Sequence, residues 1–169
     1  YLETVGINML DTPAVNGIVT SSRDVTDRRQ METRLRESQQ MLQLVLDTIP
    51  VRVFWKDTES RFLGCNRLFA QDMGAASPQD LIGKSDYDFT TRDLADAYRV
   101  DDLEVMQSQQ SRLNYEERLQ RSDGSEIWLR TSKIPLLDST GQCFGMLGSF
   151  DDISAIRQAE TERDRLQEQ

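Results

Sequence analysis

The sequence contains no histidine among its 169 residues. Histidine is the usual general base at neutral pH and a common ligand of zinc and haem iron. Its absence excludes a histidine-based catalytic triad, a histidine-ligated haem, a histidine-bearing zinc site and a phospho-accepting histidine within this sequence. No other figure in the composition removes as many classes of function.

Cysteine and long apolar runs are also scarce. Cys65 and Cys143 lack the paired spacing of a zinc or redox motif, so two reduced, mostly buried thiols in a cytoplasmic protein are expected. No apolar run approaches the roughly 20 residues of a membrane span, and no signal-peptide pattern is present. We therefore expect no membrane contact by this segment.

Positive charge is in the minority, since 20 Lys and Arg residues stand against 29 Asp and Glu residues, for a net charge of −9. This acidity argues against nucleic acid or an anionic membrane as a partner. Hydrophobic residues make up 37% of the chain and charged residues 29%. This composition suffices for one modest core with exposed helices, either one domain with appendages or two very small domains.

One stretch of sequence occurs twice. GIVTSSRDVTDRRQME covers residues 17–32 and GMLGSFDDISAIRQAE covers residues 145–160, with six of sixteen aligned positions identical. In each copy a strand-like segment ends at an aspartate, and two residues later a hydroxyl side chain stands where it can cap a helix. These positions hold Asp24 and Thr26 in the first copy, and Asp152 and Ser154 in the second.

The chain before the first copy is short. Residues 1–25 have the pattern of two strands separated by Pro13 and by the turn-forming pair Asn16 and Gly17. Two strands alone are marginal in water, so we expect a hairpin that finds a partner, either a dimer mate or the edge of another sheet.

A long helix is expected next, because no Gly or Pro occurs from Asp27 to Ile49, before Pro50 stops it. Apolar residues recur at alternating spacings of four and three, with one polar member at Ser38, as in a coiled coil. The expected homodimer contact is formed by Met31, Leu35, Leu42, Val45 and Ile49. A second apolar stripe leaves open that the helix also packs on its own domain; it consists of Met41, Leu44 and Leu46.

Beyond Pro50 the elements are short and mixed. Strand patterns cover VRVFWKD and FLGC, helical patterns follow in NRLFAQDMG and TRDLADAYRVDDLEVMQSQQ, and three strands cover LNYEERLQR, EIWLRTSKIPLL and CFGMLGSFDDI. This order predicts an α+β fold with an antiparallel sheet and helices gathered on one face.

These segments together resemble a PAS domain, the sensory module of bacterial signalling proteins. The resemblance rests on VFWKD, RFLGCN, LIGKSDYDF, LADAYRVDD and DGSEIWLRTSKIPLLDSTGQCFGMLG, and above all on FDDIS. FDDIS is similar to the Asp-x-Thr signature that ends PAS domains, with Ser154 in place of the threonine. RDVT at residues 23–26 shows the usual form of that signature, so the chain start resembles the end of an upstream PAS domain.

The resemblance implies five antiparallel strands with helices on one face and a long helix at each end. It divides the chain into an upstream two-strand remnant, a coiled-coil linker helix, the sensor domain and the start of an output helix, at residues 1–26, 27–49, 50–152 and 153–169. The residues expected to transmit the signal between strands and helices are Asp24, Thr26, Asp152 and Ser154.

PAS domains enclose a pocket that holds haem, flavin, a dicarboxylate, another small ligand or nothing. The residues expected around it here are Trp55, Phe69, Tyr87, Phe89, Tyr98, Met106, Arg130 and Ser132. Alternation does not decide which face of strand 126–137 meets the pocket. Arg130 on one face or Lys133 on the other is a candidate ligand clamp, although a surface cation is the simpler interpretation of both.

The cofactor stays open, and a non-covalent flavin or a small metabolite would both be acceptable. Histidine-ligated haem is disfavoured because the sequence has no histidine. Photosensory flavin members carry a reactive cysteine in an Asn-Cys-Arg context on a pocket helix, whereas Cys65 here precedes Asn66 at a strand end. Cysteinyl-flavin photochemistry is therefore disfavoured as well.

Neither a metal site nor a catalytic constellation is expected. Four aspartates lack the graded spacing of a calcium loop and are better explained by helix capping and solvated charge: Asp86, Asp88, Asp101 and Asp102. We expect a sensory relay that is not itself an enzyme and that passes a ligand signal or an upstream change through dimer helices. Its effector, outside this sequence, would be a histidine kinase or a diguanylate cyclase. The alternative is a ligand-free PAS domain that serves as a structural dimerisation spacer.

Overall fold

The computed structural model describes residues 1–11, 13–120 and 124–167 of the chain. The chain divides into two compact units, Tyr1–Val45 and Leu46–Gln169. The first unit opens with the predicted hairpin, in which β1 (Leu2–Met9) pairs antiparallel with β2 (Gly17–Asp24). Most of the hairpin's side chains are exposed to solvent, the large apolar ones included.

The long helix α1 covers Thr26–Thr48, within one residue of the prediction at each end. No described residue of α1 is fully buried. Four of the five residues expected at the dimer contact are between 51% and 70% exposed: Met31, Leu35, Leu42 and Val45. The fifth, Ile49, follows the last helical residue and is half-buried, so it does not extend the stripe of α1.

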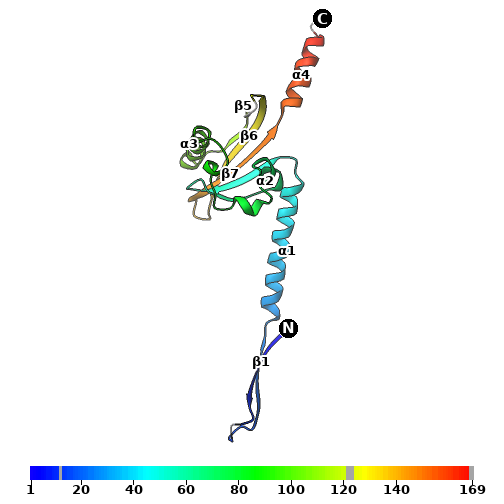
Figure 1. Cartoon of the computed structure of the whole chain (residues 1–169), viewed down its shortest axis with the longest axis vertical. Coiled ribbons are helices and arrows are strands. Elements are labelled where there is room, and N and C mark those ends of the chain that lie inside the picture. Colours follow the sequence, from blue (N-terminus) through cyan, green and yellow to red (C-terminus); the bar gives the residue numbers. More distant parts are fainter. Residues whose placement is uncertain (12, 121–123, 168–169) are drawn as a thin grey trace. The chain divides into compact units, whose positions relative to one another are not determined.

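The second unit is built on a five-stranded antiparallel sheet with the strand order β4–β3–β7–β6–β5. The strands are β3 (Arg52–Asp57), β4 (Phe62–Cys65), β5 (Arg112–Gln120), β6 (Glu126–Leu137) and β7 (Cys143–Asp152). The predicted α+β fold is confirmed. Its last strand, β7, lies at the centre of the sheet and runs directly into α4 (Ser154–Gln167) (Figure 1).

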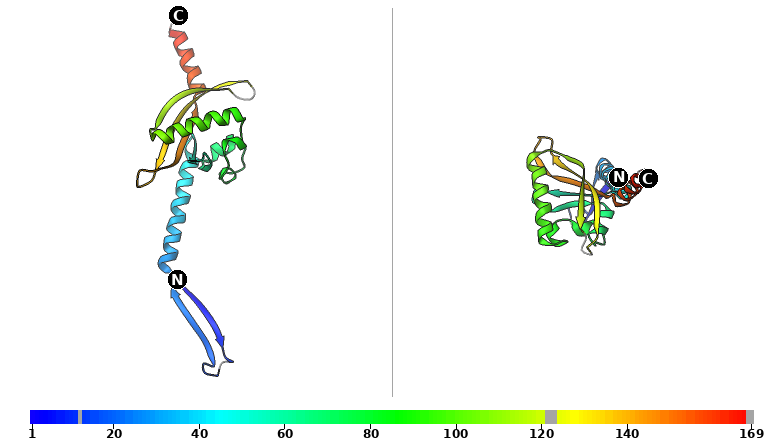
Figure 2. Two further views of the ribbon diagram at one scale, coloured as in Figure 1. Left: turned by 90° about the vertical axis from the view of Figure 1, so that its left-hand side faces the viewer. Right: turned by 90° about the horizontal axis from the view of Figure 1, so that it is seen from above.

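The connection between β4 and β5 supplies the helices. It contains α2 (Arg67–Asp72), α3 (Arg92–Ser108) and the single 3₁₀ turns η1 (Pro78–Leu81) and η2 (Asp86–Asp88). The helix α3 crosses one face of the sheet in front of β5 and β6 (Figure 2, left). Helices α2 and α3 contribute to one apolar cluster with the sheet, so they cover the same face.

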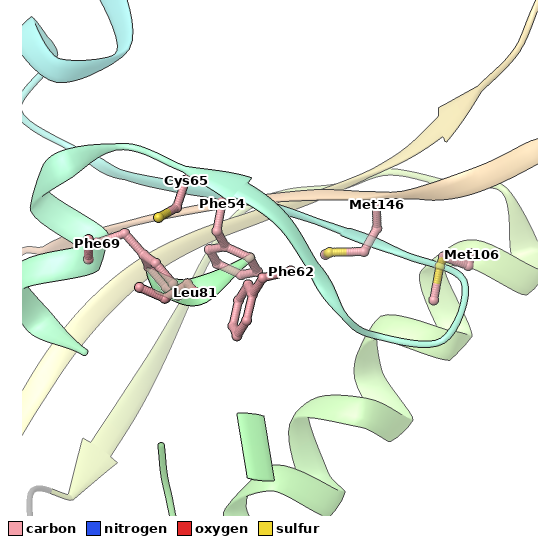
Figure 3. Close-up of a cluster of buried hydrophobic side chains, with 8 residues drawn as sticks. Phe54, Phe62, Cys65, Phe69, Leu81, Met106 and Met146 are labelled. Atoms are coloured by element: carbon pink, nitrogen blue, oxygen red, sulfur yellow. The ribbon is translucent and has the colours of Figure 1, made fainter. Parts of the chain in front are cut away.

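That cluster is the core of the second unit, and its rings point toward one another (Figure 3). The ring of Phe54 on β3 stacks on Phe69 of α2 with centroids 4.7 Å apart, and it meets Phe62 of β4 edge-on at 6.0 Å. Leu81 and Met146 are completely buried beside them. Burying each such side chain contributes about 1.5–3 kcal/mol relative to leaving it exposed, so the cluster fixes α2 and the β4–α2 connection on the sheet.

Two glycines of β7 let β3 approach closely. A Cβ atom on Gly145 would lie 2.1 Å from the carbonyl oxygen of Lys56, and one on Gly148 would lie 2.3 Å from the ring of Phe54. The matching glycine of the first copy, Gly17, would meet only the oxygen of Val15 at 3.5 Å. The second glycine has no counterpart, because Thr20 stands in the first copy where Gly148 stands in the second, and among the described residues β2 pairs with β1 alone.

Within the described part of the chain, no helix is both long enough and apolar enough to cross a membrane. The longest one, α1, carries charged side chains along much of its length.

Candidate functional site

Both copies of the duplicated sequence build the same strand-to-helix junction. The Asp24 carboxylate accepts a hydrogen bond from the backbone N–H of Thr26 at 2.9 Å, and Asp152 accepts one from Ser154 at 2.9 Å. An aspartate that accepts from the N–H two residues later closes a tight turn of the backbone. In each junction the chain therefore turns out of a strand and enters a helix within two residues.

The two junctions also bind the neighbouring strand in the same way. Val25 donates its N–H to the carbonyl oxygen of Tyr1 at 2.9 Å, and Ile153 donates to that of Trp128 at 2.9 Å. The Arg29 guanidinium lies 5.2 Å from the ring centroid of Tyr1. In the second junction the Arg157 guanidinium makes the equivalent contact, 4.9 Å from the ring centroid of Trp128.

The two hydroxyl residues do not cap their helices as expected. Ser154 is the first residue of α4, and its Oγ accepts a hydrogen bond from the Trp128 backbone N–H at 2.9 Å. Thr26 is likewise the first residue of α1, and its Oγ1 contacts the N-terminal nitrogen of Tyr1. Each hydroxyl binds the backbone at the end of the neighbouring strand. It therefore links that strand to the helix instead of accepting a hydrogen bond from a free N–H of the first helical turn.

An ion pair provides a second contact between the sheet and α4. Arg157 of α4 donates a hydrogen bond to Glu116 of β5, and Arg130 of β6 lies 3.6 Å from the same carboxylate. The hydrogen bond from Arg157 holds the pKa of the Glu116 carboxyl below its usual range. Arg157 thus contacts both Trp128 of β6 and Glu116 of β5.

The second unit contains a cavity of about 960 Å³ between α3 and the sheet. Strands β3, β5, β6 and β7 contribute side chains to it, together with α2, α3 and η2. Part of its wall is apolar, formed among others by Phe54, Leu94, Leu119, Ile127, Leu129 and Phe150. This size is within the range of pockets that hold small molecules.

A chain of buried ion pairs crosses this cavity, and Asp102 of α3 is its centre. Asp102 is 1% exposed, and its two oxygens bind two different ammonium groups. Oδ2 accepts from Lys56 Nζ of β3 at 2.8 Å, and Oδ1 accepts from Lys133 Nζ of β6 at 2.6 Å. Lys56 also pairs with Asp86 of η2, and Lys133 pairs with Asp101 of α3 at 2.7 Å.

The network continues to β5, where Arg112 and the Tyr115 hydroxyl both contact Asp101. Burial raises the pKa of Asp86, although the ammonium of Lys56 acts in the opposite direction. Burial opposes the charged form of Lys133 too, but Asp102 and Asp101 outweigh it and raise the pKa of Lys133 above its usual value. The carboxylates of Asp101 and Asp102 therefore hold Lys133 in its charged form.

These contacts correct the interpretation of four residues. Asp86, Asp101 and Asp102 are expected from the sequence as capping or solvated charges and Lys133 as a surface cation. In the structure Asp102 and Lys133 are buried in ion pairs, and Asp86 and Asp101 are partly buried in them. The reason is geometric: the residues of β6 that face α3 are Leu129, Thr131 and Lys133, and α3 turns its two aspartates toward them. The face of Trp128, Arg130 and Ser132 lies away from the cavity.

Two of the eight residues expected at the pocket, Phe69 and Tyr98, line the cavity. Burial raises the pKa of Tyr98 to about 12, so its hydroxyl keeps its proton at neutral pH. The remaining six do not line it: Trp55, Tyr87, Phe89, Met106, Arg130 and Ser132. Met106 and Phe89 instead belong to the apolar cluster or pack against it.

The other four residues have different surroundings. The Trp55 ring lies over Gly64, and the Tyr87 hydroxyl donates to Asp96 at 2.5 Å on the surface. Arg130 pairs with Glu116, while the Ser132 hydroxyl accepts a hydrogen bond from the β5 backbone. The polar side chains that the sequence did not single out for the cavity include Lys56, Arg112, Tyr115 and Glu117. The available signal for Lys56 is its place directly after the apolar run Val53–Trp55 within the same strand.

Among the described residues, no three Cys, Asp or Glu side chains converge as metal ligands. Three carboxylates inside the cavity bind ammonium or guanidinium groups instead: Asp86, Asp101 and Asp102.

Replacing Asp102 by Asn is expected to destabilise the chain strongly. The change removes the shared counterion of two buried ammonium groups, and breaking a buried pair costs about 3–5 kcal/mol. The free energy of unfolding from urea denaturation measures the loss. Glu104→Gln, an exposed change on the same helix, is the control and is expected to cost less than about 0.5 kcal/mol. A loss for Asp102→Asn as small as that of the control would contradict the role given to the network.

A model of the PAS fold family matches residues 46–158 of the chain, well over half of its length. Three sensor and signalling proteins are each 30% identical to it. DctS of Rhodobacter capsulatus, a C4-dicarboxylate transport sensor protein, aligns with 90% of this chain over 23% of its own length. A diguanylate cyclase of Vibrio cholerae aligns with 68% of this chain over 36% of its own length. The aerobic respiration control sensor protein ArcB of Escherichia coli aligns with 75% of this chain over 15% of its own length.

Solved PAS structures have the same fold at lower identity. The PAS domain of BvgS from Bordetella pertussis is 21% identical, with a TM-score of 0.57 over 80% of this chain and 98% of that one. The VqmA dimer of Vibrio cholerae is 23% identical, with a TM-score of 0.59 over 69% of this chain and 52% of that one. The chain spans at most 36% of the curated relatives named above. The chain belongs to the PAS fold family and contains one sensory domain of that kind.

Proposed function

We propose that the chain is the sensory and relay part of a longer cytoplasmic signalling protein, in which a change in the cavity alters the start of α4. The observation that carries this proposal is the double role of β6. Leu129, Thr131 and Lys133 line the cavity, while the adjacent Trp128 binds Ser154 and Ile153 at the start of α4. A movement of β6 that accommodates a ligand therefore acts directly on the junction.

The neighbouring strand β5 has the same double role. Glu117 lines the cavity and accepts a hydrogen bond from Thr131 of β6 at 2.8 Å. The adjacent Glu116 points to the other face of the sheet, where it pairs with Arg157 of α4. A ligand that displaces Glu117 would shift Glu116 with it, because the two side chains share one backbone segment. Such a ligand would change the populations of two positions of α4.

The effector of this relay lies outside the sequence. The relatives named as a transport sensor, a respiration control sensor and a diguanylate cyclase support two candidates, a histidine kinase and a diguanylate cyclase. The sensory domain itself takes no catalytic role in this proposal. Neighbouring domains of the same protein are its expected partners, including an upstream PAS domain that ends in β1 and β2.

The existence of a large cavity favours a ligand sensor over a ligand-free dimerisation spacer. A spacer needs only its surface and its helices, and close packing of the interior would stabilise it. The cavity of about 960 Å³ remains open beside a well-packed apolar cluster.

Replacing Arg157 by Ala is expected to change the cavity as well as the junction. Loss of the contacts with Glu116 and Trp128 frees both strands, and coupling between two sites acts in both directions. Amide chemical shifts of Thr131, Lys133 and Tyr98 in NMR spectra are expected to move. The control is Arg163→Ala, because Arg163 of α4 pairs with its neighbour Asp164. Shifts confined to residues near position 157 would contradict the relay.

We also propose that the chain forms a homodimer through α1, since the exposed stripe on this helix has the coiled-coil period. Leu35→Glu combined with Leu42→Glu is expected to turn the dimer into a monomer in analytical ultracentrifugation, because buried like charges repel. Thr33→Glu combined with Gln40→Glu places the same charges on the opposite side of the helix as a control. A double variant in the stripe that stays dimeric would disprove this contact.

A further inference from the structure

Every described cation around the cavity is already paired. Among the described residues, five cationic side chains line the cavity, and each has a carboxylate within 4.0 Å: Arg52 with Asp72, Lys56 with Asp102, Arg112 with Asp101, Arg118 with Glu126, and Lys133 with Asp102. An anionic ligand would find no unpaired cation among these lining residues.

Carboxylates are in excess on the same wall. Seven of them line the cavity against the five cations: Asp72, Asp86, Asp96, Asp101, Asp102, Glu104 and Glu117. Within the described part of the chain, Glu117 has no cation within 4.0 Å, and the hydrogen bond from Thr131 occupies one of its two oxygens. The groups that remain for a ligand are thus mainly hydrogen-bond acceptors.

The energy of exchanging a protein carboxylate for a ligand carboxylate also disfavours an anionic ligand. The ammonium groups of Lys56 and Lys133 each already bind two carboxylates, and a ligand carboxylate that took the place of Asp102 at either of them would leave the displaced carboxylate buried without that partner. Leaving one charge of a buried pair unpaired is strongly unfavourable. The net charge of the chain, −9, adds a long-range repulsion of anions.

A ligand with N–H donors avoids both penalties. It can donate to the second oxygen of Glu117 and to the Asp86 carboxylate without breaking any pair, while its apolar part contacts Leu119, Ile127 and Leu129. Hydrogen bonds from a charged donor to a carboxylate are among the stronger ones in proteins.

We infer that the cavity takes a small uncharged or cationic ligand with N–H donors, an amine or an amide, and excludes dicarboxylates. This inference rests on the proposed sensory function and specifies its ligand class. Three compounds with the same four-carbon chain separate the effect of charge from that of size: 1,4-diaminobutane, succinamide and succinate.

The experiment is isothermal titration calorimetry of the full chain with each compound at constant ionic strength. The diamine and the diamide are expected to bind at least about tenfold more tightly than succinate, which corresponds to about 1.4 kcal/mol. Glu117→Gln is expected to weaken binding of the diamine about fivefold or more by removing a charged acceptor. Glu162→Gln, on α4 and outside the cavity, serves as its matched control.

A second variant tests whether removal of a cavity carboxylate increases the affinity for an anionic ligand. Asp101→Asn removes one partner of Lys133 and Arg112, and it is expected to increase the affinity for succinate at least about tenfold because cations become available. Asp101 is only half-buried, so this variant is expected to remain folded.

The outcomes separate the ligand class from the sensory function. Binding of succinate as tight as that of the diamine would overturn the inferred class while leaving a ligand sensor in place. No binding of either N–H compound at millimolar concentration would also overturn the class and would favour the spacer. Binding of the diamine without any change in the amide shifts of α4 would support the class but contradict the relay.

Discussion

Asp102 is the carboxylate that two buried ammonium groups share, and the second unit is arranged around this shared ion pair. A lone lysine in the interior would lose its proton or draw in water, because burial of an unpaired charge is very unfavourable. Lys56 and Lys133 come from two strands that are not neighbours, on either side of β7. A single carboxylate on α3 can satisfy both only if the helix lies across the sheet at one place.

The network therefore fixes the position of α3, and this position creates the cavity. Phe54, Phe62 and Phe69 form a close apolar cluster on the same face, next to Lys56. Around Asp102, α3 contacts the sheet through long side chains and ion pairs, and the cavity lies between helix and sheet there. The same pairs that shape the space also saturate its cations, so the architecture and the preference for N–H donors have one cause.

The proposed transmission from the cavity to α4 depends on the alternation of side chains between the two faces of each strand. Along β5 and β6, one residue faces the cavity and the next contacts the start of α4, as Glu117 and Glu116 illustrate. The junction that receives these contacts occurs twice in the chain, with the same turn at Asp24 and Asp152. The same turn thus joins a strand to a helix at both places, and its repetition supports the relay that we propose.

Most of the fold could be predicted from the sequence, because it depends on local signals. Strand alternation, the hairpin at residues 1–25, the gap without Gly or Pro before Pro50 and the closing FDDIS segment each place an element correctly. The cavity could not be predicted, because its residues come from seven elements and the face of β6 is set by packing. Alternation alone leaves Arg130 and Lys133 equivalent, whereas in the structure only Lys133 meets α3. In the sequence Asp102 has the pattern of an exposed helix residue, because its two lysine partners are distant along the chain.

Native-state hydrogen exchange tests most directly whether the network ties α3 to the sheet. Amides of α3 around Asp102 and amides of β6 around Lys133 are expected to open with free energies that agree within about 1 kcal/mol. Lifting the helix alone would leave Lys133 without either of its carboxylate partners and Lys56 with Asp86 alone. Exchange of the α3 amides through an opening about 3 kcal/mol or more below that of β6 would contradict the account, since the helix would then detach without regard to the ion pairs.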